Sequence, residues 1–378
     1  MPAAPMSSSR APGAATPEGT LRYAARFQER AAAGHFREIA NGVVVSSIGI
    51  GTYLGEPDAA TDRGYSDSVV AAVEGGINLI DSAINYRFQR SERSVGTALR
   101  ALAAKGIERR ELVICTKAGF LTPDGEMPRD ANEYFAHEFL ERGIFRPEEI
   151  AAGCHCMTPG YLVDQIERSR VNLGVETIDV FYLHNPETQL GETPRGEFNR
   201  RISTAFEFLE TAVKEKKIHA YGLATWNAFR EDPKAQGYLS LEEMAAMARN
   251  VGGPDHHLRF VQLPFNLAMP EALTRPNQTV DGKAMPMLTA ARALGVTVVA
   301  SGSLLQGQLT RNLPPFVRNA LGLKTDSALA LQFARSVPGL TTALVGMSRV
   351  EHVKTNLELV GIEPASREQF MRLFESKS

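Results

Sequence analysis

Short apolar runs and amphipathic helical patterns alternate eight times along the chain, and this alternation limits the folds open to it. Short strands rich in Val, Ile and Leu, separated by amphipathic helices, are typical of parallel β/α units. Eight such units within about 300 residues favour a closed (β/α)8 TIM barrel, an α/β fold, over an open sheet. The predicted strands lie at residues 45–52, 78–83, 112–119, 179–185, 220–225, 259–265, 296–301 and 341–346.

The chain before the barrel is predicted to be a tail. This tail comprises residues 1–35, and its first 20 residues, rich in Ala, Pro and Ser, are expected to be disordered. A short helix is predicted over 21–34. The barrel is predicted over 36–378, and it begins with a hairpin that turns at Asn41-Gly42.

One connection is much longer than the others. Residues 120–157 follow the third predicted strand and carry a predicted helix at 130–143. Loops of this length within a compact domain are usually functional or mobile. We expect the insertion to lie at the barrel mouth, as part of the substrate pocket or as a lid. At least one of its aromatic side chains is expected to face the site: Phe120, Tyr134, Phe135 or Phe139.

Charge and composition exclude several classes of partner. The formal net charge is −2 and 43% of the residues are hydrophobic, so no basic surface indicates nucleic-acid binding. No apolar run is long enough to span a bilayer, and no membrane partner is expected. An odd number of cysteines, three, indicates free thiols and a cytoplasmic location. A small molecule is therefore the predicted partner, and no motif indicates an oligomeric state.

Four polar side chains follow three successive predicted strands. In barrels of this kind the active site lies at the carboxyl ends of the strands. Asp81 ends the second predicted strand, and Tyr86 follows it in the loop. Lys117 ends the third strand and His184 ends the fourth. Because these strands are expected to be neighbours, we predict that the four side chains converge.

Together these four residue types can deliver a proton. A phenol has a pKa of about 10, and the ammonium group of Lys117 is expected to lower it by stabilising the phenolate. Asp81 would keep Lys117 charged and in position. His184 would hydrogen-bond a substrate carbonyl, which could then take a proton from Tyr86.

Eight motifs, each at a strand end or in the helix that follows a strand, resemble in order those of the aldo-keto reductase superfamily. They are GIGTY, DSAINY, SERSVGTAL, VICTKAG, DVFYLHNP, YGLATW, VQLPFN and VGMSRVEHVKTN. The resemblance implies an oxidoreductase that reduces an aldehyde or ketone, or oxidises the alcohol, with a nicotinamide cofactor. It also implies a catalytic tetrad of Asp81, Tyr86, Lys117 and His184, with Tyr86 as the general acid.

The resemblance further implies where the cofactor would bind. The positions that it assigns to the nicotinamide half are Gly51, Thr52, Tyr53, Thr225 and Gln262. The positions that it assigns to the adenosine half are Gly346, Ser348, Arg349, His352 and Asn356. Since Ser348 and Arg349 stand where the family meets the 2′-phosphate, NADP(H) is expected to be preferred over NAD(H).

The chain departs from the family pattern at four places. Ala224-Thr225 replaces a Ser-Asn pair, and Ser301 replaces an aromatic residue. Val345 replaces a proline, and Thr355 replaces an acidic residue. These changes leave the tetrad intact, and we expect them to alter the nicotinamide contacts.

Two other functions are compatible with the same residues. A barrel lyase could use Lys117 to form a Schiff base with its substrate. A regulatory subunit could keep the cofactor site and the fold without turnover. The motif Cys154-His155-Cys156 fits no common zinc spacing, so free thiols and no metal are predicted there. The glycines of GIGTYLG are also spaced wrongly for a Rossmann fingerprint.

Overall fold

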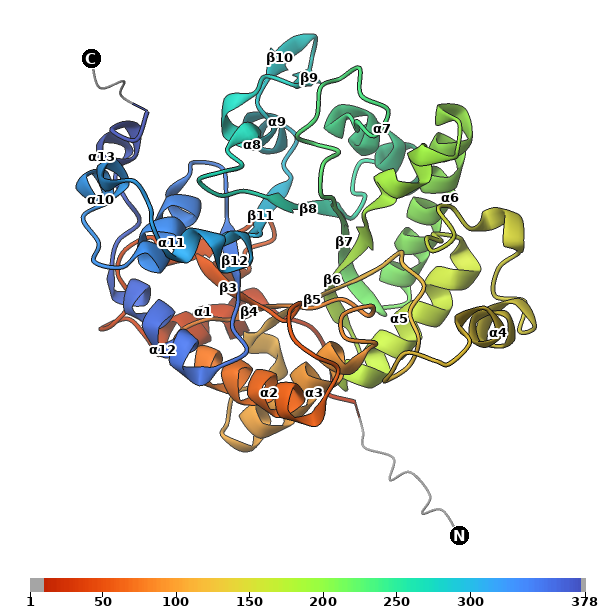
Figure 1. Ribbon diagram of the computed structural model, residues 1–378, viewed down its shortest axis with the longest axis horizontal. Coiled ribbons are helices and arrows are strands. Elements are labelled where there is room, and N and C mark those ends of the chain that lie inside the picture. The colour runs from red at the N-terminus through yellow and green to blue at the C-terminus, as the bar shows by residue number, and fades with distance from the viewer. Residues whose placement is uncertain (1–9, 375–378) are drawn as a thin grey trace.

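A closed barrel of eight parallel strands forms the centre of the molecule (Figure 1), in a computed structural model that describes residues 10–374. The strand order is β3-β4-β5-β6-β7-β8-β11-β12, and β12 pairs with β3 to close the barrel. The strands are β3 (Ile48–Gly51), β4 (Leu79–Asp81), β5 (Val113–Ala118), β6 (Ile178–His184), β7 (Ile218–Ala224), β8 (Leu258–Pro264), β11 (Thr297–Ser301) and β12 (Thr342–Gly346). The predicted (β/α)8 barrel and all eight predicted strands are confirmed.

Helices surround the barrel and cover its outer face (Figure 1). The helices that pack between successive barrel strands are α2 (Ala59–Glu74), α3 (Arg90–Ala104), α5 (Pro159–Leu173), α6 (Arg195–Lys214), α7 (Leu241–Gly252), α9 (Met287–Ala293) and α11 (Asp326–Ser336), and α12 (Val350–Leu357) follows β12. Side chains of the strands and helices form one continuous apolar layer between them. Because both faces of each strand are covered, the strands are nearly continuous apolar runs, as the sequence shows.

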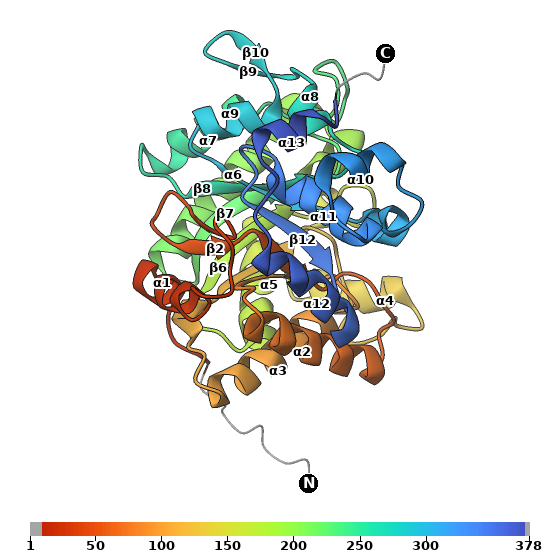
Figure 2. The same cartoon turned by 90° about the vertical axis from the view of Figure 1, so that its left-hand side faces the viewer.

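A hairpin closes the amino-terminal end of the barrel. Strands β1 (Phe36–Glu38) and β2 (Val44–Ser46) pair antiparallel, as predicted. Ile39, Val43 and Val45 of the hairpin pack against apolar side chains inside the barrel. Figure 2 shows the barrel from the side, with β2 towards its left end and α4 and α10 towards its right end. Ligands therefore reach the interior from the carboxyl ends of the strands.

The predicted disorder of the first 20 residues is wrong for residues 10–20. The backbone N–H of Ala11 donates to the carbonyl of Gly174 at 2.8 Å, and that of Ala15 donates to the buried carboxylate of Asp179 at 2.6 Å. Helix α1 (Pro17–Ala25) begins here, with the Thr16 hydroxyl as its cap, and not at the predicted position. These contacts join segments far apart in the sequence, so composition alone does not predict them. Residues 1–9 lie outside the described residues.

The insertion after β5 forms a lobe with an aromatic core of its own. Helix α4 (Ala131–Phe135) continues into a π-helical turn, Ala136–Leu140. The ring of Phe139 stacks on that of Phe145 at 5.4 Å and meets Tyr161 of helix α5 at 5.7 Å. Figure 1 shows α4 beside α5, outside the ring of strands. Most of the insertion therefore stands beside the barrel and does not cover its mouth.

Several short elements were not predicted. They are α8 (Glu271–Thr274), a hairpin of β9 (Gln278–Val280) and β10 (Lys283–Met285), α10 (Pro315–Leu321) and α13 (Arg367–Met371). The described part of the chain contains no helix with the length and apolar character needed to cross a membrane.

Candidate active site

A cavity of about 930 Å³ opens at the carboxyl ends of the barrel strands. Every predicted site residue lines it except Lys117 and Arg349. These lining residues are Gly51, Thr52, Tyr53, Asp81, Tyr86, His184, Thr225, Gln262, Gly346, Ser348, His352 and Asn356. The structure thus brings together residues that the sequence separates by up to about 300 positions.

The charged pair of the predicted tetrad lies at the cavity floor, where Asp81 lines the cavity and Lys117 lies behind it. The ammonium nitrogen of Lys117 is 2.5 Å from Oδ1 of Asp81 and donates to the carbonyl of Ser82 at 2.7 Å. The amide of Gln262 donates to Oδ2 of Asp81 at 2.8 Å. Burial is the largest single influence and opposes the charge of Lys117, but Asp81 and Tyr86 together outweigh it, and the pKa of Lys117 is raised. Both carboxylate oxygens are therefore held, and Lys117 stays an ammonium group at neutral pH.

Tyr86 stands above this pair. The ammonium nitrogen of Lys117 is 5.0 Å from the centre of its ring, and the ring of Tyr53 meets it edge-on at 4.9 Å. Burial raises the pKa of Tyr86, and the nearby ammonium group acts against this rise without cancelling it. Lys117 lowers the pKa of the phenol, as predicted, but burial is the larger influence and the net pKa of Tyr86 lies above its usual value. Tyr86 is consequently protonated at neutral pH and ready to donate.

His184 faces Tyr86 across the same corner of the cavity. The two ring centres are 5.8 Å apart, and Nδ1 of His184 is 3.2 Å from Oδ1 of Asn85. The ring of Phe120 meets the imidazole edge-on at 5.2 Å. Burial, helped by the charge of Lys117, holds the pKa of His184 well below its usual value. The imidazole is therefore neutral, with one ring nitrogen protonated.

A left-handed turn follows Tyr86 and fixes the course of its loop. Arg87, Phe88 and Gln89 have φ angles of 47°, 56° and 71°, although none of them is glycine. Such backbone costs roughly 1–2 kcal/mol per residue. The guanidinium of Arg87 offsets part of this cost, since it pairs with Asp62 at 2.7 Å and lies 4.9 Å from the ring centre of Tyr65.

The opposite side of the cavity has the features of a dinucleotide site. Gly51 and Gly346 face each other on neighbouring strands, and a Cβ on Gly346 would meet nothing within 4 Å. The hydroxyl oxygens of Thr225 and Ser303 are buried there, and no described residue hydrogen-bonds to either of them. Bare backbone and unpaired hydroxyls are suited to a flat, amide-bearing ligand. These residues fit the nicotinamide cofactor that the sequence implies.

The start of helix α12 lies at the far end of this side. Ser348 precedes the helix, and Arg349 occupies its N-cap position. Arg349 is exposed, whereas Asn356, one helix length further, is buried and lines the cavity. Backbone N–H groups at a helix start favour an anion, and an exposed guanidinium beside them adds a donor.

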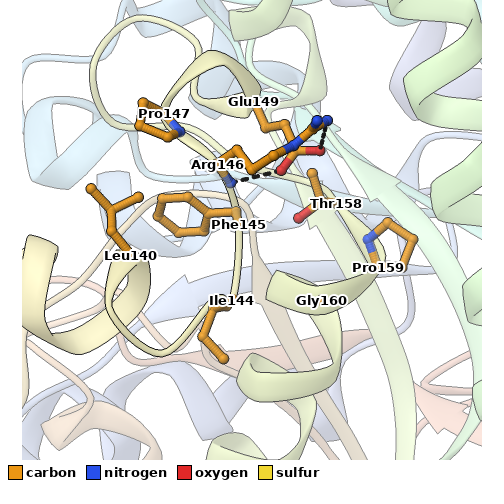
Figure 3. A pocket seen from close by; sticks show the side chains of 10 residues that line it. Leu140, Ile144, Phe145, Arg146, Pro147, Glu149, Thr158, Pro159 and Gly160 are labelled. Atoms are coloured by element: carbon orange, nitrogen blue, oxygen red, sulfur yellow. Dashed lines mark hydrogen bonds and ion pairs between the residues drawn. The ribbon is translucent and has the colours of Figure 1, made fainter.

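The insertion reaches the cavity through Phe120 alone among its four predicted aromatic residues. The stacked rings of Phe135 and Phe139 belong to the lobe instead. A second cavity of about 480 Å³ lies in this lobe (Figure 3). There the guanidinium of Arg146 already pairs with Glu149 at 2.9 Å, and no predicted site residue lines the cavity. We therefore place the chemistry in the larger cavity.

The lining residues that the sequence interpretation missed include three that lie next in sequence to predicted site residues. Asn85 contacts His184, and Asn185 and Trp226 line the cavity beside it. Each is the sequence neighbour of a predicted site residue, and this adjacency is the sequence signal that could have identified it. Cys154 and Cys156 are free thiols, as predicted, and no cluster of three or more metal-ligating side chains occurs within residues 10–374.

Comparison with known proteins identifies the family. The model of the aldo/keto reductase family matches residues 47–315. An Escherichia coli (strain K12) protein described as an NADH-specific methylglyoxal reductase is 26% identical over 191 residues, 49% of this chain and 50% of that one. A D-threo-aldose 1-dehydrogenase from a Pseudomonas species is 27% identical over 161 residues, 41% of this chain and 42% of that one.

The matches thus span about half the length of these curated relatives. Among solved structures, an aldo/keto reductase from Klebsiella pneumoniae in complex with NADP and acetate is 20% identical. It covers 90% of this chain and 95% of its own, with a TM-score of 0.60, and it shows the same fold. Since the family model covers well over half of the sequence, the chain belongs to the aldo/keto reductase family.

Proposed function

We propose that the protein reduces an aldehyde or ketone, or oxidises the corresponding alcohol, with a nicotinamide cofactor, and that Tyr86 is the general acid. The observation that carries the proposal is the placement of a protonated phenol and a neutral imidazole on one wall of a large cavity, above the buried Asp81–Lys117 pair. Few other reactions need this combination of groups.

In the proposed reaction Tyr86 and His184 hold the substrate oxygen between them. Nδ1 of His184 carries the ring proton and donates to Oδ1 of Asn85, so Nε2 is an acceptor and can take a hydrogen bond from the hydroxyl of the alcohol form. Tyr86 gives its proton to the carbonyl oxygen as negative charge develops there. The ammonium group of Lys117, held by Asp81, stabilises the phenolate that results. A bound nicotinamide supplies or accepts the hydride at the substrate carbon.

The cofactor would lie across the glycine-lined side of the cavity. Thr225 offers an unpaired hydroxyl to the carboxamide, and Gln262 offers its carbonyl oxygen because its amide nitrogen is bonded to Asp81. Ser348 and Arg349 would meet a 2′-phosphate at the start of α12. NADPH is therefore preferred in the proposal, although one relative is named as NADH-specific and one structural neighbour was solved with NADP.

The proposed substrate is an uncharged carbonyl compound. Among residues 10–374 no lysine or arginine lines the cavity, so a carboxylate or phosphate on the substrate would find no cationic partner among them. Phe120, Trp226 and the amide of Asn185 supply aromatic faces and hydrogen bonds instead. The names of the two curated relatives, a methylglyoxal reductase and an aldose dehydrogenase, also describe uncharged carbonyl substrates or products.

The two other functions have less support. A Schiff-base lyase needs an accessible neutral amine, whereas the Lys117 side chain is 0% exposed, ion-paired and absent from the cavity lining. A regulatory subunit that binds cofactor without turnover has no need of a Tyr86 positioned over an ammonium group.

The test is Tyr86→Phe, assayed with a panel of uncharged aldehydes and ketones and both reduced cofactors. Loss of a general acid typically lowers the rate about 10²–10⁴-fold, and cofactor dissociation constants should stay near the wild-type values. Turnover by wild type of no carbonyl in the panel would refute the proposed function. Near-normal turnover by the variant would refute the role of Tyr86.

A further inference from the structure

The Cys-His-Cys motif forms a short strap that runs along the end of strand β5. His155 is bridged to both Phe120 and Ala151 by antiparallel pairing. The backbone N–H of Cys156 donates to Gly119 at 2.8 Å, and that of Leu121 donates to Cys154 at 2.8 Å. The strap thus carries the His155 side chain to the end of β5, where it is 1% exposed.

His155 belongs to a chain of buried and partly buried hydrogen bonds whose direction is fixed. Arg201 donates to Oε1 of Gln189 at 2.7 Å, because a guanidinium can only donate. The amide nitrogen of Gln189 then donates to Nδ1 of His155 at 3.0 Å. With Nδ1 accepting, Nε2 carries the proton and donates to the backbone carbonyl of His184 at 2.8 Å. The chain therefore ends on the residue that faces the substrate.

A second contact links the same two histidines. The ring of Phe120 meets the His155 ring edge-on at 5.2 Å and the His184 ring edge-on at 5.2 Å. Gly119 lies tightly against the hydrogen bond, since a Cβ there would come within 2.6 Å of both the His184 carbonyl oxygen and Nε2 of His155. His155 therefore contacts the backbone of His184 directly and its imidazole through the ring of Phe120.

Another buried histidine shows what an ordinary structural role looks like. His35 is 0% exposed, and its Nε2 lies 2.9 Å from the carbonyl of Gly76 while its Nδ1 lies 3.2 Å from the Ser47 hydroxyl. Burial lowers the pKa of both His35 and His155 to about 4, so both rings are neutral. The two differ in what they hold, because only His155 bonds to a residue that lines the active-site cavity.

We propose that His155 is a positioning residue for His184, and that the strap of residues 154–156 exists to place the imidazole that contacts the substrate oxygen. The proposal rests on the proposed function for its kinetic consequence, but the geometry itself can be tested without turnover. Small misplacements of a catalytic group can lower rates about 100-fold, so the backbone bond at His184 is a sensitive point.

The kinetic test compares His155→Ala, His155→Gln and the matched control His35→Ala. His155→Ala should lower kcat about 10- to 100-fold and leave the NADPH dissociation constant unchanged. His155→Gln keeps an N–H donor near the position of Nε2, so it should recover most of the loss. His35→Ala should lower the unfolding midpoint and leave kcat within about twofold of wild type. If His155→Ala does not fold, Gln189→Leu interrupts the same chain of bonds one step earlier and should also lower kcat.

A measurement that needs no turnover separates this proposal from the proposed function. With ¹⁵N-labelled histidine, the ring nitrogen signals of His184, assigned by their loss in His184→Gln, should shift in His155→Ala or Gln189→Leu but not in His35→Ala. Unchanged His184 signals would overturn the positioning role whether or not wild type turns over a carbonyl. With an active wild type, an equal loss of kcat in His35→Ala, or no recovery in folded His155→Gln, would overturn it as well.

Discussion

Replacing Asp81 by asparagine tests the buried pair most directly. The Lys117 side chain is 0% exposed and 2.5 Å from Asp81, so the variant leaves an ammonium group in the interior without its counter-charge. Breaking a buried pair in this way costs roughly 3–5 kcal/mol. We expect the lower end, since the Ser82 carbonyl still accepts from Lys117. Lys117→Met should cost a similar amount, because it leaves Asp81 with Gln262 as its remaining donor.

The double variant Asp81→Asn/Lys117→Met removes both charges together. It should be far less destabilised than the sum of the single variants, with a coupling of about 3 kcal/mol. Urea unfolding at pH 7 measures all four proteins. Additive effects, or a single-variant cost below about 1 kcal/mol, would contradict the ion-pair reasoning.

The pH dependence gives an independent check on the same pair. In wild type the pKa of Lys117 is raised, so its stabilisation is present below 10.5 and is lost as the pH rises through the folded-state value. In Asp81→Asn burial should instead lower that pKa. The unfolded state then binds more protons than the folded one below pH 10.5, and stability should rise with pH. Unfolding of the variant at pH 7 and pH 9 should therefore show greater stability at pH 9, and the opposite order would refute this account.

Three further predictions concern the cofactor, the carboxylate below Trp226 and the substrate. Arg349→Ala should reduce the preference for NADPH over NADH by roughly tenfold, the lower end for a charge-assisted hydrogen bond, because the Arg349 side chain is exposed. Equal dissociation constants for the two cofactors in wild type would contradict this role of Arg349. Glu187 accepts from the backbone N–H of Trp226 at 2.8 Å, and burial raises its pKa from 4.5 to about 7. Because the carboxyl pKa is raised on folding, wild-type stability should fall by up to about 3 kcal/mol as the pH rises from 4.5 to about 7. In urea unfolding Glu187→Gln should reduce this dependence of stability on pH. An unchanged dependence would exclude Glu187 as its source. For substrates of equal size, kcat/KM should be higher for an uncharged aldehyde than for a keto acid, because the cavity lining formed by the described residues offers no lysine or arginine to a carboxylate. A preference for the keto acid would contradict the proposal that the substrate is uncharged.

The sequence was sufficient for the barrel because each strand is short, apolar and followed by an amphipathic helix. It was also sufficient to bring Asp81, Lys117 and His184 together, since neighbouring parallel strands end at the same edge. Their chemical roles remain predictions. The net direction of the pKa shift of Tyr86 was not predictable from the sequence, because it depends on how deeply folding buries the phenol.

Contacts between distant segments account for the remaining errors. Residues 10–20 have a defined structure in part because the backbone N–H of Ala15 donates to the carboxylate of Asp179, more than 150 positions later. The bond from Gln262 to Asp81 spans 181 positions and has no local signature. The motif around His155 matches no zinc spacing, and the acceptor of its Nε2 proton is a backbone carbonyl, which no side-chain pattern can reveal.

The left-handed turn after Tyr86 also has a consequence for the order in which the molecule is assembled. No residue in Arg87–Gln89 favours this backbone by itself, so the turn is stable only after its anchors exist. One anchor is Asp62 of helix α2, and another is Asn172 of helix α5, which donates to Gln89 at 3.1 Å. The phenol is therefore expected to reach its final place only after α5 has docked, so chains released before α5 is complete would contain Tyr86 but no active site.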